Sequence, residues 1–322
     1  MGKGRPVTDL FVDHLSFALG DEARSVEETA QSGKTLSGAQ MLREAGFLKH
    51  HVCRPGSTPY DLAKRAVEPI RGKLGEVGAI VYATCLPLNG NVGSPDRYRE
   101  TGDVKHLMDF PASHLQADFG LHRAVVVGLN QQACTGLLGS LQLAKGLLLA
   151  EPAVGRVLCV TADRFPEGAL YEQSYNLISD GAAACVVSPE PAGYRLLAWH
   201  GITNGALSNA SDDETVGSYF NYTHRLIQET LAKAKLTIRE IAWVVPQNTN
   251  AKAWQILSRL LPVPFERVYF RSMPEVAHLI SGDNIINLKY LDAEGGIRPG
   301  EKALLVMAGY GLNWQCVILE KR

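Results

Sequence analysis

The segment 125–150, VVVGLNQQACTGLLGSLQLAKGLLLA, decides which fold the chain can adopt. Its first residues are apolar and β-branched, as in a buried strand, whereas residues 135–150 have the apolar periodicity of a core helix. A short turn of small and polar residues joins the two parts and holds one cysteine, Cys134. The pattern therefore predicts a strand that runs directly into a helix, with Cys134 at the first turn of that helix.

This position gives Cys134 the setting of a nucleophile. The free backbone N–H groups and the positive end of the helix dipole stabilise an anion, so they can lower the pKa of a thiol below its ordinary value of about 8.5. The neighbours Ala133, Thr135 and Gly136 are small and leave room for a substrate carbonyl. Position alone fits a buried structural cysteine equally well, and both interpretations stay open at this point.

Composition predicts an ordinary globular protein. The 322 residues are 46% hydrophobic, and 32 Lys and Arg nearly balance 33 Asp and Glu. We therefore expect neither a nucleic-acid partner nor an anionic membrane surface. The N-terminus has no signal-peptide pattern, and no apolar run reaches the roughly 18 residues of a membrane span, so we expect the cytoplasm.

The six cysteines lie far apart in the sequence. No C-x-x-C pair and no Cys/His cluster at zinc spacing occurs, so we predict neither a metal site nor a disulfide framework. Cys159, Cys185 and Cys316 stand within apolar runs of strand length, where a cysteine acts as a small buried hydrophobe.

Apolar runs of strand length alternate with helical segments along the first half of the chain. Strands are predicted at 77–85, 122–130 and 156–163, with the helix 135–150 between the last two. Such alternation is typical of α/β proteins in which helices cover a largely parallel or mixed sheet.

The second half repeats this organisation. Its predicted elements are helices at 218–235, 250–261 and 282–293, strands at 241–247 and 267–270, and a hairpin at 301–320. We therefore expect two similar halves, residues 1–180 and 181–322, which form one layered body with the site at their junction.

Four further stretches place the chain in a known family. They are LISDGAAACVVS (177–188), VVPQNTN (244–250), AHLISGDNIINL (277–288) and VMAGYGLNW (306–314). In their order and spacing the chain resembles the thiolase-like condensing enzymes, and most closely β-ketoacyl-acyl-carrier-protein synthase III. The resemblance runs from residue 35 to residue 319 and implies a layered α-β-α-β-α fold.

The resemblance also implies roles for individual residues. Cys134 becomes the nucleophile that accepts an acyl group. The oxyanion hole combines the backbone N–H of Cys134 with that of Tyr310 in the GYG turn, because such donors stabilise the charge that develops in acyl transfer. Asp180 and Gly181 become structural. The residues implied in substrate binding are Asn250, Asn284, Gly309 and Gly311.

The chain departs from the family at the residues that support decarboxylation. Decarboxylating members have a His in an HQAN-like loop and an Asn in a GN loop; here Gln247 and Asp283 stand at these places. Gln donates hydrogen bonds but accepts no proton near pH 7, and an ionised Asp283 repels an enolate. Both departures disfavour carbon–carbon condensation, although a shift of one residue would let Asn284 replace the missing Asn.

The second loop resembles instead a branch of the family that transfers acyl groups to oxygen or nitrogen with Cys, His and Asp. Residues 273–288, MPEVAHLISGDNIINL, fit that branch through Pro274, His278, Asp283 and Asn287. Two alternatives are open: His278 acts as the base with Asp283 orienting it, or Asp283 or water deprotonates the acceptor and His278 is structural.

We therefore predict an acyltransferase in which Cys134, Gln247, His278 and Asp283 take part in catalysis. The alternatives are decarboxylative condensation and a non-catalytic partner of an active paralogue. The resemblance implies acyl-coenzyme A or acyl-carrier-protein donors, no further cofactor, and a homodimer formed across the edge beside residues 85–95. An acidic carrier protein would dock on a basic patch, for which the candidates are Lys252, Arg259, Arg267 and Arg271.

Overall fold

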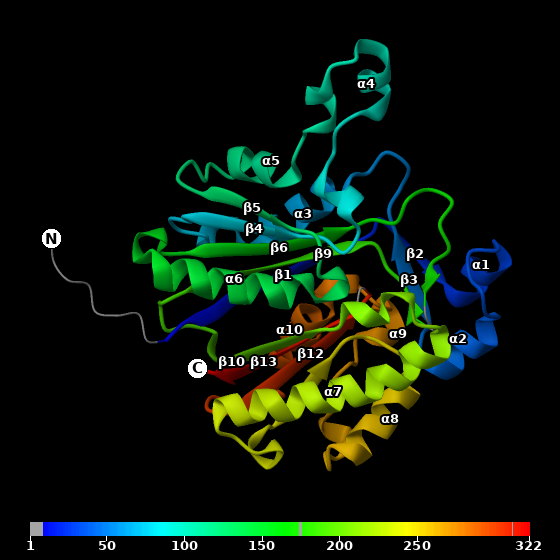
Figure 1. The fold of residues 1–322 in the computed structure, drawn as a ribbon, viewed down its shortest axis with the longest axis vertical. Helices are drawn as coiled ribbons and strands as arrows, with labels where there is room; N and C mark the ends of the chain where they lie inside the picture. The colour runs from blue at the N-terminus through cyan, green and yellow to red at the C-terminus, as the bar shows by residue number, and fades with distance from the viewer. Residues whose placement is uncertain (1–8, 174–175, 311) are drawn as a thin grey trace, which may run out of the picture.

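The computed structural model describes residues 9–173, 176–310 and 312–322, and a mixed nine-stranded sheet runs through them (Figure 1). The first half-sheet contains, in spatial order, β1 (Phe11–Leu19), β9 (Gly181–Ser188), β6 (Val157–Asp163), β4 (Ala79–Ala83) and β5 (Val125–Leu129). The second contains β10 (Tyr194–Thr203), β13 (Asn313–Lys321), β12 (Lys302–Gly309) and β11 (Trp243–Pro246). Only two residue pairs of β1 and β10 join the half-sheets, Phe11 with Arg195 and Val12 with Tyr194.

The two half-sheets repeat one topology. In the first, β1 and β9 are antiparallel, β9 and β6 are antiparallel, and β6 and β4 are parallel. In the second, β10, β13, β12 and β11 follow the same sequence of directions. The first half adds β5, parallel to β4, at its outer edge. The expected duplication is therefore present in the strand pairing.

The boundary between the halves differs from the expected one at residues 180 and 181. Strand β9 begins at Gly181, but it pairs with β1 and β6 of the first half-sheet. The second half begins with β10 at Tyr194. The sequence pattern does not show this boundary, because β9 is an apolar strand like its neighbours. Only its pairing with β1 and β6 assigns it to the first half.

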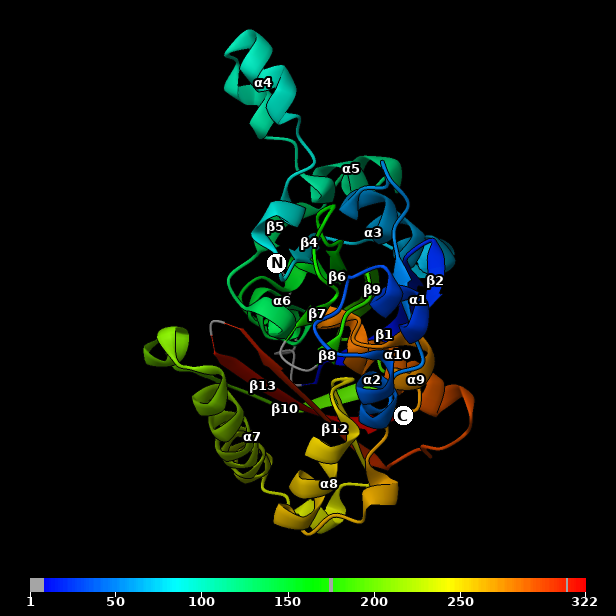
Figure 2. The same ribbon diagram turned by 90° about the vertical axis from the view of Figure 1, so that its right-hand side faces the viewer.

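Helices form three layers around the half-sheets, as Figures 1 and 2 show. An outer pair covers the first half-sheet, a central pair lies between the half-sheets, and a second outer pair covers the other half-sheet. These pairs are α3 (Pro59–Val67) with α5 (Pro111–Asp118), α6 (Gly136–Ala150) with α10 (Asp283–Ala293), and α7 (Asp212–Ala234) with α8 (Ala251–Leu260). The core between the sheets joins apolar residues of α6, α10 and both half-sheets. The predicted α-β-α-β-α fold is thus confirmed.

Smaller elements complete the body. The hairpin strands β2 (Glu22–Ser25) and β3 (Lys49–Val52) carry α1 (Val26–Gln31) and α2 (Ala39–Ala45) between them, and a two-stranded ribbon is formed by β7 (Glu172–Gln173) and β8 (Asn176–Leu177). One short helix, α9 (Met273–Val276), precedes the loop that leads to α10. Another, α4 (Pro95–Thr101), projects from the body beyond α5 (Figure 2).

One predicted strand is absent as such. Residues 267–270 form no strand, and Val268 makes a single isolated bridge to Val244. The apolar pattern there reflects burial of Tyr269 and Val268 against the second half-sheet rather than a strand in that sheet.

The segment Ala133–Ala150 is long and apolar enough to cross a membrane, and half of it is buried in the fold. Leu137, Leu138 and Leu141 of this segment are fully buried in the core between the half-sheets. Its apolar character is therefore that of a core helix.

Candidate active site

A cavity of about 730 Å³ opens where β11 and β12 end and where the chain enters α6. Cys134, Gln247 and His278 line it, and most of its wall is apolar. The apolar and aromatic side chains of that wall include Phe165, Ile178, Tyr219, Phe220, Ile256, Ile280, Leu312 and Trp314. The cavity is thus suited to an apolar group that ends at a few polar side chains.

Cys134 occupies the expected place at a helix start. It belongs to the 3₁₀ turn Ala133–Thr135, which leads directly into α6 at Gly136. Ala133 has a positive φ of 45°, and the Ser281 hydroxyl donates a hydrogen bond to its carbonyl at 3.2 Å. A conformation that L-residues rarely adopt is therefore held here by a contact from the second half of the chain.

The end of β12 lies against the backbone of Cys134. A Cβ atom added to Gly309 would be 2.8 Å from the Cys134 nitrogen, so only glycine permits this approach. Gly309 and Tyr310 both line the cavity. The predicted oxyanion donors at Cys134 and Tyr310 thus come from two adjoining turns, and their role remains a prediction. Gly311 lies outside the described residues.

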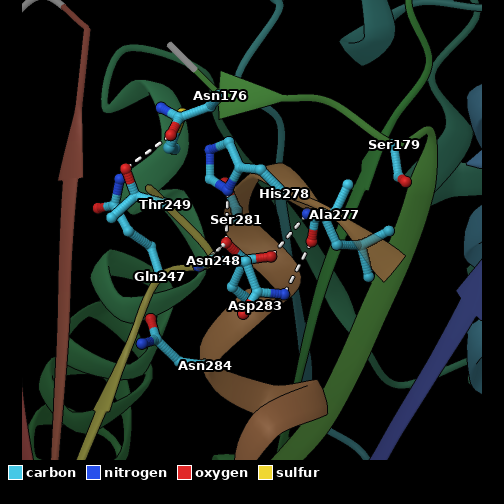
Figure 3. Close-up of polar contacts among 12 residues, drawn as sticks. Asn176, Ser179, Gln247, Asn248, Thr249, Ala277, His278, Ser281, Asp283 and Asn284 are labelled. Atoms are coloured by element: carbon cyan, nitrogen blue, oxygen red, sulfur yellow. Dashed lines mark hydrogen bonds and ion pairs between the residues drawn. The ribbon is translucent and has the colours of Figure 1, made fainter. Parts of the chain in front are cut away.

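His278 and Asp283 form a buried pair (Figure 3). The Nδ1 atom of His278 bonds the Asp283 carboxylate, whose oxygens also accept the N–H groups of Asn248 at 2.7 Å and Leu279 at 2.6 Å. Because Asp283 engages Nδ1, the Nε2 atom of His278 is the one left for the cavity, which Cys134 also lines and where the two side chains interact electrostatically. Asp283 is fully buried behind the histidine.

Backbone contacts fix the histidine from both sides. The N–H of His278 donates to Leu177, and its carbonyl accepts from Ser179, both at 2.9 Å. The preceding residue, Ala277, has a positive φ of 56°, and the Asn248 side chain donates to its carbonyl at 2.8 Å. Such strained backbone persists where surrounding contacts determine it, which indicates that the position of His278 is held tightly.

The electrostatics favour a thiolate beside a protonated imidazole. A hydrogen bond from the Cys85 thiol and the interaction with His278 lower the pKa of Cys134 below its ordinary value, although burial opposes this. Burial would lower the pKa of His278, but the Asp283 carboxylate and Cys134 outweigh burial and raise the His278 pKa. The arrangement is that of an activated cysteine.

Gln247 lies on the same cavity wall. Its Oε1 atom accepts the N–H of Ala308 at 2.6 Å, so its amide N–H₂ group is left to donate. Asn250, also a lining residue, caps α8 by accepting the Lys252 N–H at 3.0 Å. The loop that holds Gln247 and Asn250 therefore supplies hydrogen-bond donors, and it contains no histidine that could act as a base.

Asn284 does not reach the cavity. Its amide donates to the carbonyls of Val245 at 2.8 Å and Val306 at 3.2 Å, so it bridges β11 and β12. Figure 3 shows it pointing away from His278. The predicted substrate-binding role of Asn284 does not fit this geometry, and neither does the one-residue shift that would make it the missing Asn.

The structure also changes the expected place of Asp283. In one of the two alternatives Asp283 acts directly on the acceptor, but it is His278 that lines the cavity, with Asp283 behind it. Of the two alternatives left open, the geometry favours a histidine oriented by Asp283. The two are five positions apart, and the positive φ of 47° at Ile280 between them has no sequence signal because isoleucine rarely adopts it.

The sequence did not predict the contact between Cys85 and Cys134. The Sγ atom of Cys85 lies 3.8 Å from that of Cys134, and Cys85 lines the same cavity. A signal existed: Cys85 follows β4 as Cys134 follows β5, and these strands are parallel neighbours. Parallel strands end at one edge of a sheet, so residues just after them can meet.

The predicted basic patch is reduced to one residue at the cavity. Lys252 lines the cavity and pairs loosely with Glu44 at 3.9 Å. Arg271 instead pairs with Glu294. Glu294 follows the last residue of α10, and the length of that helix, about 16 Å, separates it from Asp283 at the helix start. Arg259 and Arg267 are not among the lining residues.

Among the residues that the structure describes, no group of three or more His, Cys, Asp or Glu side chains is placed to hold a metal ion. The polar groups that line the cavity include a thiol pair, an imidazole, amides and the Lys252 ammonium, together with Thr249, whose hydroxyl donates to Asn176 at 2.6 Å.

The duplicated half-sheets and a cysteine at the start of the central helix define the thiolase-like class of α/β proteins. Two family models match the chain: 3-oxoacyl-[acyl-carrier-protein] synthase III at residues 130–205, and the C-terminal domain of the same synthase at 231–321. The chain therefore belongs to the 3-oxoacyl-acyl-carrier-protein synthase III family.

Relatives and solved structures agree with this family. A β-ketoacyl-acyl-carrier-protein synthase III of Wolbachia pipientis wMel is 23% identical over 93% of each chain. The structure of ChlB3, an acyltransferase, matches 97% of this chain and 98% of its own with a TM-score of 0.80 at 21% identity. The synthase III of Aquifex aeolicus VF5 has the same TM-score at 18% identity, over 97% and 99% of the two chains. At these identities the structures establish the fold.

We predict that Cys134 reacts with iodoacetamide as a thiolate at neutral pH. Its alkylation rate, followed by peptide mass spectrometry against pH, should have a midpoint below about 8.5, the value of an ordinary thiol. His278→Ala should move this midpoint upward, because it removes a group that stabilises the thiolate. The exposed His122→Ala is the control and should leave the midpoint unchanged. An unshifted midpoint in His278→Ala would contradict the thiolate–imidazolium pair.

Proposed function

We propose that this protein is an acyltransferase that accepts an acyl group from a coenzyme A or carrier-protein thioester on Cys134 and passes it to an acceptor. The observation that carries the proposal is the placement of His278, held at Nδ1 by Asp283 and lining the same cavity as Cys134. A cysteine, a histidine and a carboxylate in this order form a nucleophile, a base and its orienting group.

In the first step the Cys134 thiolate attacks the thioester carbonyl carbon. The carbonyl electron pair moves onto oxygen, and the backbone N–H groups of Cys134 and Tyr310 stabilise the oxyanion. Collapse of this intermediate breaks the carbon–sulfur bond of the donor. The departing thiolate takes the proton from Nε2 of His278, which leaves an acyl-cysteine and a neutral imidazole.

In the second step the neutral His278 acts as the general base. It removes the proton from the hydroxyl or amine of the acceptor, which attacks the acyl carbonyl. Collapse of the new intermediate releases the acyl product and restores the Cys134 thiolate beside a protonated His278. Asp283 is a positioning residue throughout, because it orients the ring and stabilises the imidazolium without contacting the substrate.

The lining of the cavity fits an apolar acyl group, with the rest of the thioester donor entering beside α8. Its aromatic and aliphatic wall would bury the acyl chain, and the Gln247 amide would donate to a carbonyl. Lys252 at the mouth would meet a phosphate or an acidic carrier protein. The thioester is a substrate, so the proposed reaction needs no separate cofactor, and we place it in cytoplasmic fatty-acid-derived or specialised metabolism.

Decarboxylative condensation is the second candidate. Gln247 and protonated His278 both present donors to the cavity, and two donors on the thioester oxygen could stabilise an enolate. Release of carbon dioxide from a malonyl thioester distinguishes the two reactions, because acyl transfer to oxygen or nitrogen releases none. A non-catalytic partner subunit would form no acyl-cysteine at all.

The intact mass of the protein after incubation with a panel of acyl-coenzyme A and acyl-carrier thioesters tests the proposal directly. We expect the wild type to gain the mass of one acyl group and Cys134→Ala to gain none. The donor that loads best identifies the acyl class. A folded wild type that forms no adduct with any donor would favour the non-catalytic role.

Variants of the histidine pair test the two steps. His278→Ala should slow transfer from the acyl-cysteine about 10²–10⁴-fold, the usual contribution of a general acid–base group. Asp283→Asn removes the carboxylate that raises the His278 pKa, so the pH at which transfer is half-maximal should fall. A merely structural role for Asp283 would change the amount of active protein but leave this pH unchanged.

We also propose a homodimer formed through β5. This strand is the outer edge of the sheet, and its Val125 and Val126 side chains are 57% and 38% exposed. An apolar strand edge without charges pairs readily with a second strand, and the same strand of another copy gives a two-fold contact.

Light scattering after size exclusion tests this dimer. The wild type should elute at twice the chain mass, and Val126→Lys should shift it to the monomer mass because it places like charges across the two-fold axis. Leu260→Lys, at an exposed position on α8, is the control and should remain dimeric. A monomeric wild type would refute the proposal.

A further inference from the structure

Two thiols share the active-site cavity, and the mechanism above uses only one of them. The Sγ atoms of Cys85 and Cys134 lie 3.8 Å apart, and both residues are half-buried cavity-lining residues. A disulfide requires about 2.05 Å between the sulfurs, so the atoms need to approach by less than 2 Å. Rotation about the Cα–Cβ bonds of the two cysteines is the movement that would bring the sulfurs together.

The two cysteines sit on supports of different kinds. Cys134 is held at the start of α6, whereas Cys85 stands on the loop after β4. The buried Asp163 carboxylate orders that loop by accepting the N–H groups of Cys85 at 3.0 Å and Leu86 at 3.1 Å and the hydroxyl of Thr84 at 2.7 Å. The thiol of Cys85 is therefore kept beside Cys134 and is not turned to solvent.

The two thiols are also unlike in charge. The pKa of Cys134 is lowered by its neighbours, and the hydrogen bond to Cys134 together with burial raises the pKa of Cys85. Thiolates react with peroxides and thiols do not, so oxidation would begin at Cys134. Cys85 would then be the second, resolving thiol.

The remaining cysteines cannot take this part. Cys53, Cys159, Cys185 and Cys316 are at most 5% exposed. Cys159 and Cys185 are directly paired neighbours on β6 and β9, yet both lie in the closed core. Proximity and access to the cavity therefore occur together only at Cys85 and Cys134 among the described cysteines.

We propose that Cys85 and Cys134 form a reversible disulfide that protects the nucleophile from irreversible oxidation and switches acyl loading off while it lasts. This redox site goes beyond the proposed acyl transfer, since it requires only the two thiols and a small oxidant such as hydrogen peroxide.

The chemistry balances in two steps. The Cys134 thiolate attacks one oxygen of hydrogen peroxide and the O–O bond breaks, which gives a sulfenic acid and, after protonation, one water. The Cys85 sulfur then attacks the sulfenic sulfur, forms the S–S bond and displaces the oxygen as a second water. The Cys134 thiolate and the Cys85 thiol together lose two electrons and one proton, and the second proton that the two waters need comes from solvent. A dithiol reductant such as dithiothreitol returns the two electrons.

Peptide mapping of the full-length protein under non-reducing conditions tests the proposal. After brief exposure to hydrogen peroxide we expect a peptide pair linked through Cys85 and Cys134, which dithiothreitol separates. The matched pair Cys159 and Cys185 should remain unlinked under the same treatment. The measurement reads thiol chemistry and not catalysis, so it stands even if no acyl donor loads Cys134.

The Cys85→Ser variant tests whether Cys85 protects Cys134 from irreversible oxidation or only lies near it. In this variant peroxide should drive Cys134 to the sulfinic and sulfonic acids, which dithiothreitol does not reverse, whereas the wild type should recover all its free thiols. The proposal is refuted if Cys134 of the wild type forms the sulfinic and sulfonic acids as fast as Cys134 of the Cys85→Ser variant does and if the wild type yields no linked peptide. Diamide in place of peroxide repeats the test with an oxidant that needs no sulfenic acid.

Discussion

The carboxylate of Asp283 is the contact on which the site depends. It holds the His278 ring and accepts two backbone N–H groups, one from the loop after β11 and one from the loop before α10. Burial of a carboxylate costs free energy unless its hydrogen-bond partners are all present, so the loss of one of these three contacts would weaken the other two. Because Asp283 is also the first residue of α10, the free N–H groups of the helix start stabilise its charge. One side chain thereby ties two loops and a helix into a single rigid unit.

The layered fold could be predicted because its signals are repeated along the chain. The strand and helix at 125–150 appeared where their pattern placed them, and so did the final hairpin. Two features could not be predicted. The assignment of β9 to the first half depends on its pairing partners, and the burial of residues 267–270 depends on packing that resembles a strand only in its apolar pattern.

The site was predicted in its residue types more than in its geometry. Helix-start chemistry was sufficient to identify Cys134, and spacing within one loop suggested His278 and Asp283. The sequence could not predict the direction in which each side chain points. Asn284, next to Asp283, points to the strand carbonyls because consecutive helical residues face about 100° apart. The contact of Cys85 with Cys134 was not predicted because it arises between neighbouring strands and not within one segment.

The halves of the chain meet across the reaction centre, and this has a consequence for synthesis on the ribosome. The nucleophile and Cys85 belong to the first half, but the proposed base and its orienting carboxylate, His278 and Asp283, are translated more than 140 residues later. A nascent first half therefore carries Cys134 without the imidazole that gives and takes up protons in the proposed acyl transfer. The proposed catalytic set is complete only when the last third of the chain has emerged and docked, so that completion of the fold and assembly of the site are one event.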